Sequence, residues 1–583
     1  MALSTTIPRP EFPRPDFERS EWINLNGVWE FAFDDEDLGL KQRWKSGQIP
    51  LDRTILVPYC YQSKMSTLGI EEVHEIVWYR RTFQIPPSMK NKRILLKFGA
   101  VDYECTLWVN GEFVGSHRGG HVPFQFDITD TLGDENTVVL RVVDREDPAQ
   151  PRGKQTWRGQ RFGCWYTPTT GIWQTVWLEA VGETAIDHVK MTPNLDEKTV
   201  TIEYVLDHFQ SDLELRALVT LGNRLTITRS ASVQRGSGTF TVDIDWPDEL
   251  DDSILWRPES PNLFDIELSV VKQGVVLDRI KSHFGMRKIY VRDGMIILNN
   301  VPYTEKLILD QGYWPESLLT PPSDEAIKAD ILAAKAFGFN GARKHQKAED
   351  PRFAYWADVL GFLVWSEMPS NYQFSDQGMA AMVDEWRAII QRDYNHPSIV
   401  TWVPLNESWG VWNILRDKKM QEFSRTLYCL TRSLDHTRLV SSNDGWEQVE
   451  SDICAIHDYE ASGEVFKEKI QDLDHYLKTK SDWRLIYADG ARYQGQPLIL
   501  TEYGGISFAG AKEGEWGYRS PVSNEEEFLA RFASMTRAAL DSGKFAGICY
   551  TQLTDVQQEI NGLLTADRKP KINPVKIKAI LDR

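Results

Sequence analysis

The chain has 583 residues, which is enough for three or four domains of ordinary size. Hydrophobic residues make up 42% of it and charged residues 26%, as in ordinary globular proteins with packed cores. A net charge of −18 opposes binding to nucleic acid or to an anionic membrane surface. Because no apolar run approaches the length of a membrane-spanning helix, about 18 residues, we expect no membrane partner either.

The six cysteines lie far apart, with no CxxC pair and no cluster with histidine. This spacing argues against a zinc site or a disulfide framework and is typical of isolated thiols in a reducing compartment. The first ten residues contain no apolar core of signal-peptide length. We therefore expect a cytoplasmic protein, unless a signal peptide has been removed, and leave open whether it forms a homo-oligomer.

Residues 1–181 are predicted to form a β-sandwich. Short stretches rich in β-branched and aromatic residues recur without a long helical pattern, and the turn dipeptide Asn110-Gly111 directly follows one of them, as in a tight hairpin. Many short strands of this kind close naturally into a sandwich. The predicted strands are Gly27–Phe33, Ile76–Phe83, Arg93–Phe98, Cys105–Val109 and Thr137–Val143.

Residues 182–288 are predicted to form a second sandwich of about immunoglobulin-domain size. Apolar and polar residues alternate cleanly here, so each sheet has one solvated face. No pattern in this block suggests chemistry, and we expect it to act as a spacer. Its clearest strands are Thr199–Val205, Leu213–Thr220 and Leu263–Val270.

Residues 289–583 change to apolar strands that alternate with helical stretches, and eight such strands over this length predict a (β/α)8 barrel. Helices are expected over Asp324–Phe337, Gly378–Asp393 and Lys418–Leu434, whereas residues 461–497 read as a long loop. The eight strands are Lys306–Leu309, Gly341–Lys344, Leu363–Ser366, Ile399–Leu405, Leu439–Ser442, Ile453–Ile456, Leu498–Thr501 and Gly547–Tyr550.

Polar side chains follow nearly every barrel strand, at the point where the strand ends. Barrel enzymes carry their catalytic groups at these carboxyl ends, so the pattern predicts an active site there. The residues concerned are Asp310, Gln311, His345, Glu367, Asn406, Glu407, Asn443, Asp444, Trp446, His457, Asp458, Tyr459, Glu502, Tyr503, Gln552 and Asp555.

Two of these residues form a candidate catalytic pair. Glu407 follows the fourth strand and Glu502 the seventh, so the two can face each other across the barrel mouth. Paired carboxylates suit glycoside hydrolysis, in which one protonates the leaving oxygen and the other serves as nucleophile or base. A carboxyl separation of about 5–5.5 Å indicates retention and one of about 6.5–9.5 Å inversion.

The sequences around this pair resemble glycoside hydrolase family 2. Trp402–Ser408 and Leu500–Gly505 look like the acid/base and nucleophile motifs of that family, which contains β-galactosidases, β-glucuronidases and β-mannosidases. Trp22–Trp29, Trp108–Gly111 and Gly171–Trp177 are similar to signatures of its N-terminal sugar-binding sandwich. The resemblance covers the whole chain and implies the same order of three domains.

The resemblance implies a retaining mechanism with Glu407 as general acid/base and Glu502 as nucleophile. It also implies that Asn406 binds the sugar 2-hydroxyl. Arg343 fits a family position from which it would orient the nucleophile, whereas His345 lies one residue earlier than the family pattern places it.

Each of the other candidate residues could have either a functional or a purely structural role. His457 and Tyr459 would hold a sugar hydroxyl and the nucleophile, or pack under a loop. Sugar stacking is proposed for three tryptophans and hydroxyl binding for two acids, and each could instead be a packing residue. These five are Trp314, Trp409, Trp446, Asp310 and Glu367.

No metal-ligand spacing stands out, and retaining hydrolysis does not require an ion, so we predict no metal and no cofactor. The predicted ligand is a glycoside or oligosaccharide, cleaved at its terminal non-reducing residue. A non-catalytic carbohydrate-binding protein is the alternative of a different class. Sugar transfer to an acceptor other than water would use the same intermediate.

The sugar itself is less well constrained. In the family, a β-glucuronidase binds the substrate carboxylate through an Asn-x-Lys motif shortly before a segment like Asp567–Pro570. This chain has Glu559-Ile-Asn561 there, so the cation is missing and glucuronides are disfavoured. Leu309–Glu316 also differs from the segment of many β-galactosidases. We therefore expect a neutral sugar, first a β-galactoside, with β-mannoside, galactofuranoside and arabinoside open.

Overall fold

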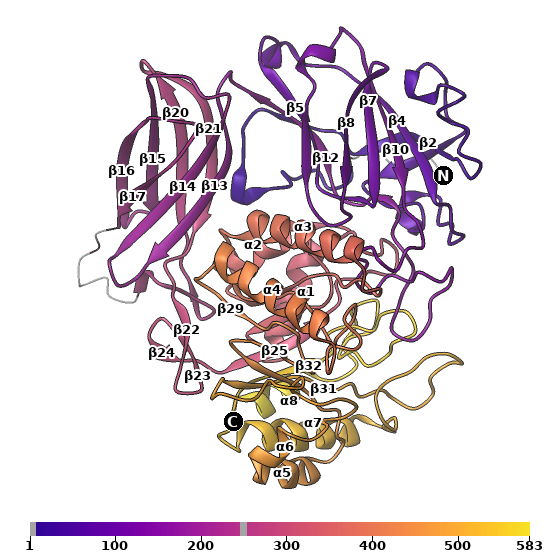
Figure 1. The fold of residues 1–583 in the computed structure, drawn as a ribbon, viewed down its shortest axis with the longest axis vertical. Coiled ribbons are helices and arrows are strands. Elements are labelled where there is room, and N and C mark those ends of the chain that lie inside the picture. Colours follow the sequence, from indigo (N-terminus) through magenta and orange to yellow (C-terminus); the bar gives the residue numbers. More distant parts are fainter. Residues whose placement is uncertain (1–6, 245, 247–252, 583) are drawn as a thin grey trace.

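The computed structural model describes residues 7–244, 246 and 253–582, and Figure 1 shows them as two β-sandwiches above a barrel. Among these residues, no helix combines the length and the apolarity needed to cross a bilayer. The chain passes from the first sandwich to the second and then through a small three-stranded sheet into the barrel.

The first sandwich consists of two antiparallel sheets around one core, which contains Trp29, Tyr79 and Leu178. One sheet has the strand order β3 (Arg53–Val57), β2 (Gly27–Phe33), β4 (Ile76–Phe83), β10 (Asn136–Val143), β7 (Glu104–Val109), β8 (Glu112–Arg118). The other has the order β1 (Trp22–Asn24), β12 (Val176–Val181), β5 (Arg93–Phe98), β9 (Phe124–Asp127). The short strands β6 (Val101–Asp102) and β11 (Gly171–Ile172) pair separately.

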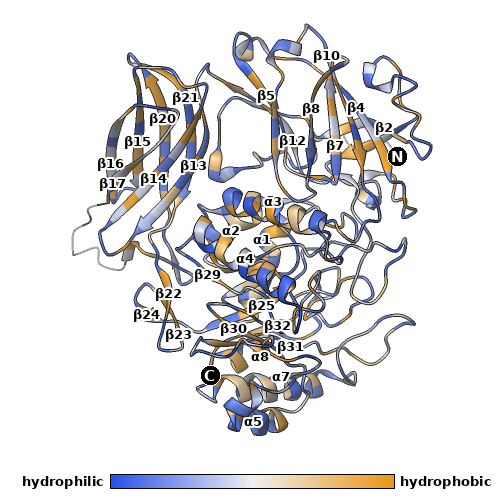
Figure 2. Cartoon of the chain, viewed as in Figure 1, coloured by the Kyte–Doolittle hydropathy of each residue, from blue (hydrophilic) through white to orange (hydrophobic). Residues whose placement is uncertain are grey.

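The second sandwich packs a three-stranded sheet on a four-stranded one. Buried and exposed residues alternate along its strands, as the hydropathy colours show on β20 (Figure 2). The sheets are β13 (Ala185–Asn194), β14 (Thr199–Asp207), β17 (Ser237–Asp243) and β16 (Leu225–Val233), β15 (Leu213–Leu221), β20 (Phe264–Lys272), β21 (Val275–Phe284). Shorter pairings follow in β18 (Trp256–Arg257), β19 (Ser260–Pro261), β22 (Ile289–Arg292), β23 (Met295–Leu298) and β24 (Val301–Pro302).

The predicted barrel is present as eight parallel strands. In chain order they are β25 (Glu305–Asp310), β26 (Gly341–Lys344), β27 (Leu363–Glu367), β28 (Ile399–Val403), β29 (Leu439–Val440), β30 (Cys454–His457), β31 (Leu498–Gly504) and β32 (Phe545–Thr551). Between β29 and β30 the amide of Gln448 bonds both the N–H and the C=O of Ala455, at 3.2 and 2.7 Å.

Within the described ranges, eight α-helices cover the barrel strands or lie beside them. Each follows a Ser, Asp or Asn whose side chain accepts a hydrogen bond from the first turn, which satisfies an N–H that otherwise lacks a partner. They are α1 (Asp324–Ala336), α2 (Pro351–Leu360), α3 (Asp376–Asp393), α4 (Lys418–Leu434), α5 (Gly463–Gln471), α6 (Leu473–Tyr476), α7 (Glu525–Leu540) and α8 (Pro574–Leu581). Short 3-10 helices are η1 (Pro15–Phe17), η2 (Trp44–Ser46), η3 (Lys64–Ser66), η4 (Pro87–Met89) and η5 (Thr129–Thr131).

The prediction of a loop over residues 461–497 is wrong in part, because α5 and α6 lie there. Both helices are short, and α5 buries only three of its residues, Gly463, Phe466 and Ile470. So narrow an apolar stripe among charged residues gives little periodic signal in the sequence.

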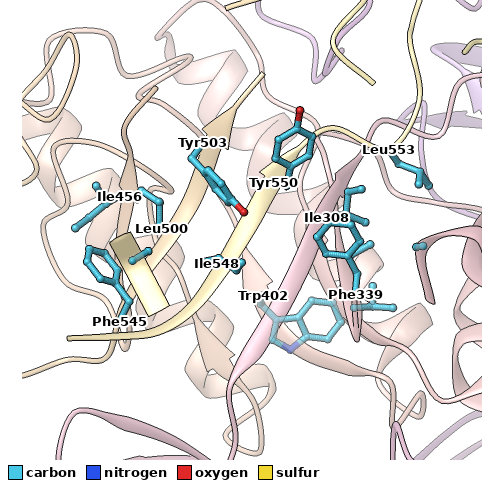
Figure 3. Packing of buried hydrophobic residues seen from close by; sticks show 14 of the residues in the cluster. Ile308, Phe339, Trp402, Ile456, Leu500, Tyr503, Phe545, Ile548, Tyr550 and Leu553 are labelled. Carbon is cyan, nitrogen blue, oxygen red and sulfur yellow. The ribbon is translucent and has the colours of Figure 1, made fainter. Parts of the chain in front are cut away.

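Alternate residues of each barrel strand face opposite sides. Ile308, Leu500 and Ile548 pack outward against the helix layer (Figure 3), while neighbours such as Leu309 and Ile499 pack with Trp365 inside the barrel. This alternation decides which residues at the strand ends can reach the barrel mouth.

Candidate active site

Glu407 and Glu502 lie close together at the carboxyl ends of β28 and β31. One oxygen of Glu407, one oxygen of Glu502 and a ring nitrogen of His457 all lie within 4.8 Å of one another. Glu502 is buried, whereas Glu407 is half-buried. The two carboxylates therefore lie close enough together to act on one reacting carbon.

A β-bulge in β31 directs Glu502 into the barrel. Ile456 of β30 pairs with Leu500, and the next residue, His457, pairs with Glu502, so Thr501 is the extra residue. Without that insertion Glu502 would share the outward face of Leu500. The bulge therefore places the carboxylate beside His457.

Glu407 lies in a tight turn after β28. Both Glu407 and Ser408 have left-handed backbone conformations, with φ of 52° and 60°, which are unfavourable for residues with a side chain. Two hydrogen bonds hold the turn: Glu407 N donates to Asp444 O at 2.9 Å, and Ser408 N donates to Asn443 Oδ1 at 3.0 Å. Backbone strain of this kind is common at catalytic residues, where the surroundings fix the conformation.

Arg343 on β26 contacts four of the polar groups in the site. It donates from Nη2 to Glu502 Oε1 at 2.7 Å and to Asn406 Oδ1 at 2.9 Å, and from Nε to Glu367 Oε2 at 3.0 Å. Its Nη1 lies 3.0 Å from Asp444 Oδ1. Arg343 is completely buried, so its charge acts on these carboxylates with little screening by water.

His457 is surrounded by carboxylates. Its Nδ1 lies 2.8 Å from Glu407 Oε1, and its Nε2 lies 2.8 Å from Asp444 Oδ1 and 3.5 Å from Glu502 Oε1. Burial alone would lower the pKa of His457, but the charge of Glu502 and the hydrogen bonds to Asp444 and Glu407 raise it to about 9. At neutral pH the imidazole is therefore a cation that donates from both nitrogens.

Glu502 is held in its ionised form. Burial alone would raise its pKa, but the charges of His457 and Arg343 outweigh burial and lower the pKa to about 2. Tyr459 donates its hydroxyl to Glu502 Oε2 at 2.5 Å, which further favours the carboxylate. A buried anion without a proton is suited to act as a nucleophile.

Glu367 and His345 lie next to Arg343. Glu367 Oε1 accepts a hydrogen bond from Gln346 N at 3.1 Å and lies 3.1 Å from His345 Nδ1. Burial raises the pKa of Glu367 to about 7, although Arg343 opposes the shift. Burial lowers the pKa of His345 well below its ordinary value, so this imidazole is neutral.

Comparison with known protein families identifies the family of enzymes to which the chain belongs. The family 2 glycosyl hydrolase sugar binding domain matches residues 23–160, a second family 2 domain matches 184–287, and the family 2 TIM barrel domain matches 323–583. The chain belongs to glycoside hydrolase family 2. The protein is thus a glycoside hydrolase, and the alternative of a non-catalytic carbohydrate-binding protein is not supported.

Two kinds of family 2 enzyme resemble this chain. A β-galactosidase from Thermoanaerobacter pseudethanolicus is 26% identical over 67% of the chain and 51% of its own length. A β-glucuronidase from Paenibacillus borealis is 25% identical over 96% of both proteins. The chain thus spans about half of the first relative and nearly all of the second. The crystal structure of Ruminococcus gnavus β-glucuronidase shares the fold, with a TM-score of 0.79, 18% identity and 99% of both chains covered.

The structure of this family 2 hydrolase brings most of the predicted site residues together. Two of the predicted stacking residues line the same region: Trp446 packs edge-on to His457 at 5.9 Å, and Trp409 lies 5.1 Å from the ring of Trp165. The residues around the carboxylate pair are Arg343, His345, Glu367, Asn406, Trp409, Trp446, His457 and Tyr459.

The structure does not bring Asp310 and Trp314 to the pair. Since Leu309 faces the barrel interior, Asp310 faces the helix layer, where it accepts a hydrogen bond from Lys344 Nζ at 2.7 Å. Trp314 packs beneath the charges of Lys347 and Arg568, at 5.2 and 4.9 Å. These two residues therefore lie apart from the carboxylate pair, because position after a strand does not specify which face a side chain takes.

Residues of the first sandwich that the sequence pattern does not predict also reach the site. The segment 144–170, which joins β10 to β11, carries Lys154, Trp165 and Tyr166 to the barrel mouth. A long aromatic-rich stretch without strand alternation was the available signal for a functional loop.

Two groups of histidine and carboxylate have ligand atoms close enough for a metal ion among the described residues. One is Glu407, His457 and Glu502, in which His457 pairs with both carboxylates. The other, His283, Asp358 and His396, lies between the second sandwich and the barrel, and both imidazoles bond the same carboxylate oxygen. Internal hydrogen bonds thus account for both groups without an ion.

Proposed function

We propose that the protein hydrolyses terminal glycosides with retention of configuration, by double displacement. Glu407 gives its proton to the glycosidic oxygen while Glu502 attacks the anomeric carbon, which forms a covalent glycosyl ester and releases the alcohol. Water then attacks the same carbon, Glu407 takes the proton of that water, and Glu502 leaves as a carboxylate. The net reaction is hydrolysis, and both glutamates return to their starting states.

The separation of the carboxylates is the observation that carries this proposal. Oxygens of Glu407 and Glu502 lie within 4.8 Å of each other. An inverting enzyme needs about 6.5–9.5 Å to hold a water molecule between carboxylate and sugar. The observed gap supports direct attack by Glu502.

Asn406 is placed to bind the sugar hydroxyl next to the reacting carbon. Its Oδ1 accepts from Arg343, while its buried Nδ2 has no partner among the described residues. A buried donor without a partner costs about 1–3 kcal/mol, which a sugar hydroxyl in hydrogen-bond contact would recover. Other buried polar atoms without a partner near the barrel mouth are Gln311 Oε1, Trp409 Nε1, Trp446 Nε1 and Gln552 Oε1.

The substrate is proposed to be a neutral sugar, first a β-galactoside, with β-mannoside, galactofuranoside and arabinoside as alternatives. The relatives include both β-galactosidases and β-glucuronidases, so similarity to them does not distinguish a galactoside from a glucuronide as the substrate. The segment around Glu559 disfavours a glucuronide because it lacks a cation. Lys154 brings a cation to the site from another domain, so its contacts bear directly on the choice between a neutral sugar and a uronic acid.

A panel of nitrophenyl glycosides tests the proposal. It should include β-galactoside, β-mannoside, β-glucuronide, β-galactofuranoside and α-arabinoside, with NMR of the first product formed from the best substrate. We expect turnover of a neutral member and an initial product with the configuration of the substrate. Glu502→Gln should lower kcat at least about 10³-fold, while the exposed control Glu526→Gln should not. No turnover of any member, or an inverted product, would contradict the proposal.

A further inference from the structure

A loop of the first sandwich is fixed to the barrel rim directly beside the catalytic strands. The backbone N–H groups of Arg152 and Gly153 both donate to Ser370 O, at 2.9 and 3.0 Å. Gly153 has a φ of +59°, and a Cβ there would lie 2.0 Å from Gln346 O. The loop therefore packs so closely on the residues that follow β26 and β27 that only glycine fits.

This packing places the next residue, Lys154, inside the site. Its side chain is only 7% exposed, although it belongs to another domain. Burial alone would lower the pKa of Lys154, but Cys164 and the carboxylates of Glu559 and Glu407 raise it, so the amine is charged. Throughout the described part of the chain no carboxylate oxygen lies within ion-pair distance of this amine. It forms a side-chain hydrogen bond with Cys164, and an ammonium has three N–H groups, so others remain available to a ligand.

Glu559 approaches the same space from the barrel. Its Oε2 accepts from Tyr166 OH at 2.5 Å and its Oε1 from Asn561 Nδ2 at 3.1 Å. Each carboxylate oxygen can accept a further hydrogen bond. Glu559 is 2% exposed, so both partners fix its position without filling its capacity as an acceptor.

The two loops that carry Lys154 and Glu559 are bound to each other. Gln558 Nε2 donates to Gly163 O and Trp165 O, both at 2.9 Å, and Gln557 Nε2 donates to Thr167 Oγ1 at 3.0 Å. A charged amine and a buried carboxyl group are therefore held at fixed positions on facing loops, one from each domain. Burial raises the pKa of Glu559, and the charge of Lys154 opposes that rise.

We propose that Lys154 and Glu559 bind neighbouring hydroxyl groups of the terminal sugar and so select a neutral sugar over a uronic acid. Of two adjacent hydroxyls, one can accept from the ammonium and the other can donate to the carboxylate. A sugar carboxylate would gain Lys154 but would meet the negative charge of Glu559 and lose the donor that Glu559 needs. This inference rests on the proposed function and concerns the same site.

Three variants test the inference with the best neutral glycoside of the panel and its uronic acid counterpart. Lys154→Met and Glu559→Gln should each lower kcat/KM for the neutral substrate about 10- to 100-fold, since each removes a charged hydrogen bond. Their double variant should lose less than the product of the two effects, because both contact one sugar. Arg161→Met, an exposed position of the same loop, should match the wild type.

Glycosides that lack one hydroxyl separate sugar binding from a structural role. The analogue without the hydroxyl bound by Lys154 should be poor for the wild type, yet no worse for Lys154→Met. Glu559→Gln should also narrow the preference for the neutral sugar over the uronic acid. A wild-type preference for the uronic acid, or an unchanged kcat/KM in folded Lys154→Met, would overturn the inference. Turnover that depends on Glu502 would leave the proposed function intact in either case.

Discussion

At the scale of single residues, the site keeps Glu502 ionised and surrounds the two glutamates differently. Arg343, His457 and Tyr459 all contact Glu502, two as cations and one as a hydroxyl donor. Glu407 contacts only His457 among these and is more exposed. These different surroundings agree with the different tasks proposed for two residues of the same type.

Replacing Tyr459 by phenylalanine should shift the acidic limb of the pH profile. Activity needs ionised Glu502, whose pKa of about 2 places this limb well below the ordinary range of a glutamate. The lost hydrogen bond stabilised the ionised form, so the pKa rises and activity is lost at a higher pH, by about one unit. The measurement is kcat/KM from about pH 1.5 to 7, in assays short enough for the protein to stay folded at the lowest pH. An acidic limb that does not move would contradict this role of Tyr459.

Replacing Glu407 by alanine should affect substrates according to their leaving groups. The proton from Glu407 matters most for a poor leaving group, so kcat/KM for an alkyl glycoside should fall about 10²- to 10⁴-fold. A dinitrophenyl glycoside needs little protonation and should form the covalent intermediate at close to the normal rate. Added azide should restore turnover by replacing water as the attacking group. Equal losses for both leaving groups would contradict the acid/base role.

At the scale of elements, two local irregularities position the side chains of the site. The bulge at Thr501 directs Glu502 inward, and the contact of Gly153 with the barrel rim delivers Lys154. Neither feature belongs to the regular strand pattern. The regular strands and helices form the scaffold, and the bulge and the close loop contact orient the functional side chains.

Gly153→Ala tests the contact between the first sandwich and the barrel. An added Cβ would collide with Gln346 O, so the loop must shift and Lys154 must move. We expect at least about a 10-fold loss of kcat/KM with a folded protein. Gly222→Ala is the matched control, because that glycine also has a left-handed backbone, with φ of +50°, but nothing within 4 Å of the added atom. Equal effects on activity in both variants would show that the contact is not what matters.

The sequence predicts the elements and the strand-end residues better than the details of the site. Strand limits such as Gly27–Phe33 and Ile76–Phe83 match the structure because apolar alternation is a local signal. His457 follows from its position at a strand end, whereas Arg343 follows from the resemblance to family 2. Asp310 lies on the other side of its strand because one residue of register reverses the face. Lys154 does not follow from the barrel pattern because it reaches the site from the first sandwich, far from the barrel strands along the chain.

At the scale of the whole molecule, buried charges connect the domains. Arg19 bonds Glu179 of the first sandwich at 2.6 Å and Asp278 of the second at 2.9 Å. His283 of the second sandwich and His396 of the barrel both bond Asp358 of α2, His283 at 2.8 Å and His396 at 2.5 Å. Since the loop with Lys154 must meet the barrel closely, fixed domain positions are needed for a complete site.

Asp358→Asn should weaken the contact between the second sandwich and the barrel by about 3 kcal/mol, because it leaves two buried histidines without their anion. Burial alone would raise the pKa of Asp358, but His396 and His283 lower it to about 2. A depressed carboxyl pKa stabilises the fold above its unfolded value near 3.8, and this stability is lost as the pH falls towards 2. Thermal unfolding at pH 6 and pH 3 should therefore differ less in the variant.

Asp376→Asn is the control for that experiment, because Asp376 pairs with Lys419 on the surface and should contribute less than about 1 kcal/mol. Equal melting temperatures for wild type and Asp358→Asn at pH 6 would contradict a stabilising role for the interdomain ion pairs.

The measurement that tests the central claim most directly is the identification of the residue that carries the sugar. The wild-type enzyme would be stalled with a 2-deoxy-2-fluoro derivative of its best substrate and then mapped by peptide mass spectrometry. The structure predicts one fluorosugar on the peptide that contains Glu502, and none in Glu502→Gln. A label on Glu407, or full inactivation without any covalent label, would contradict the assignment of Glu502 as the nucleophile.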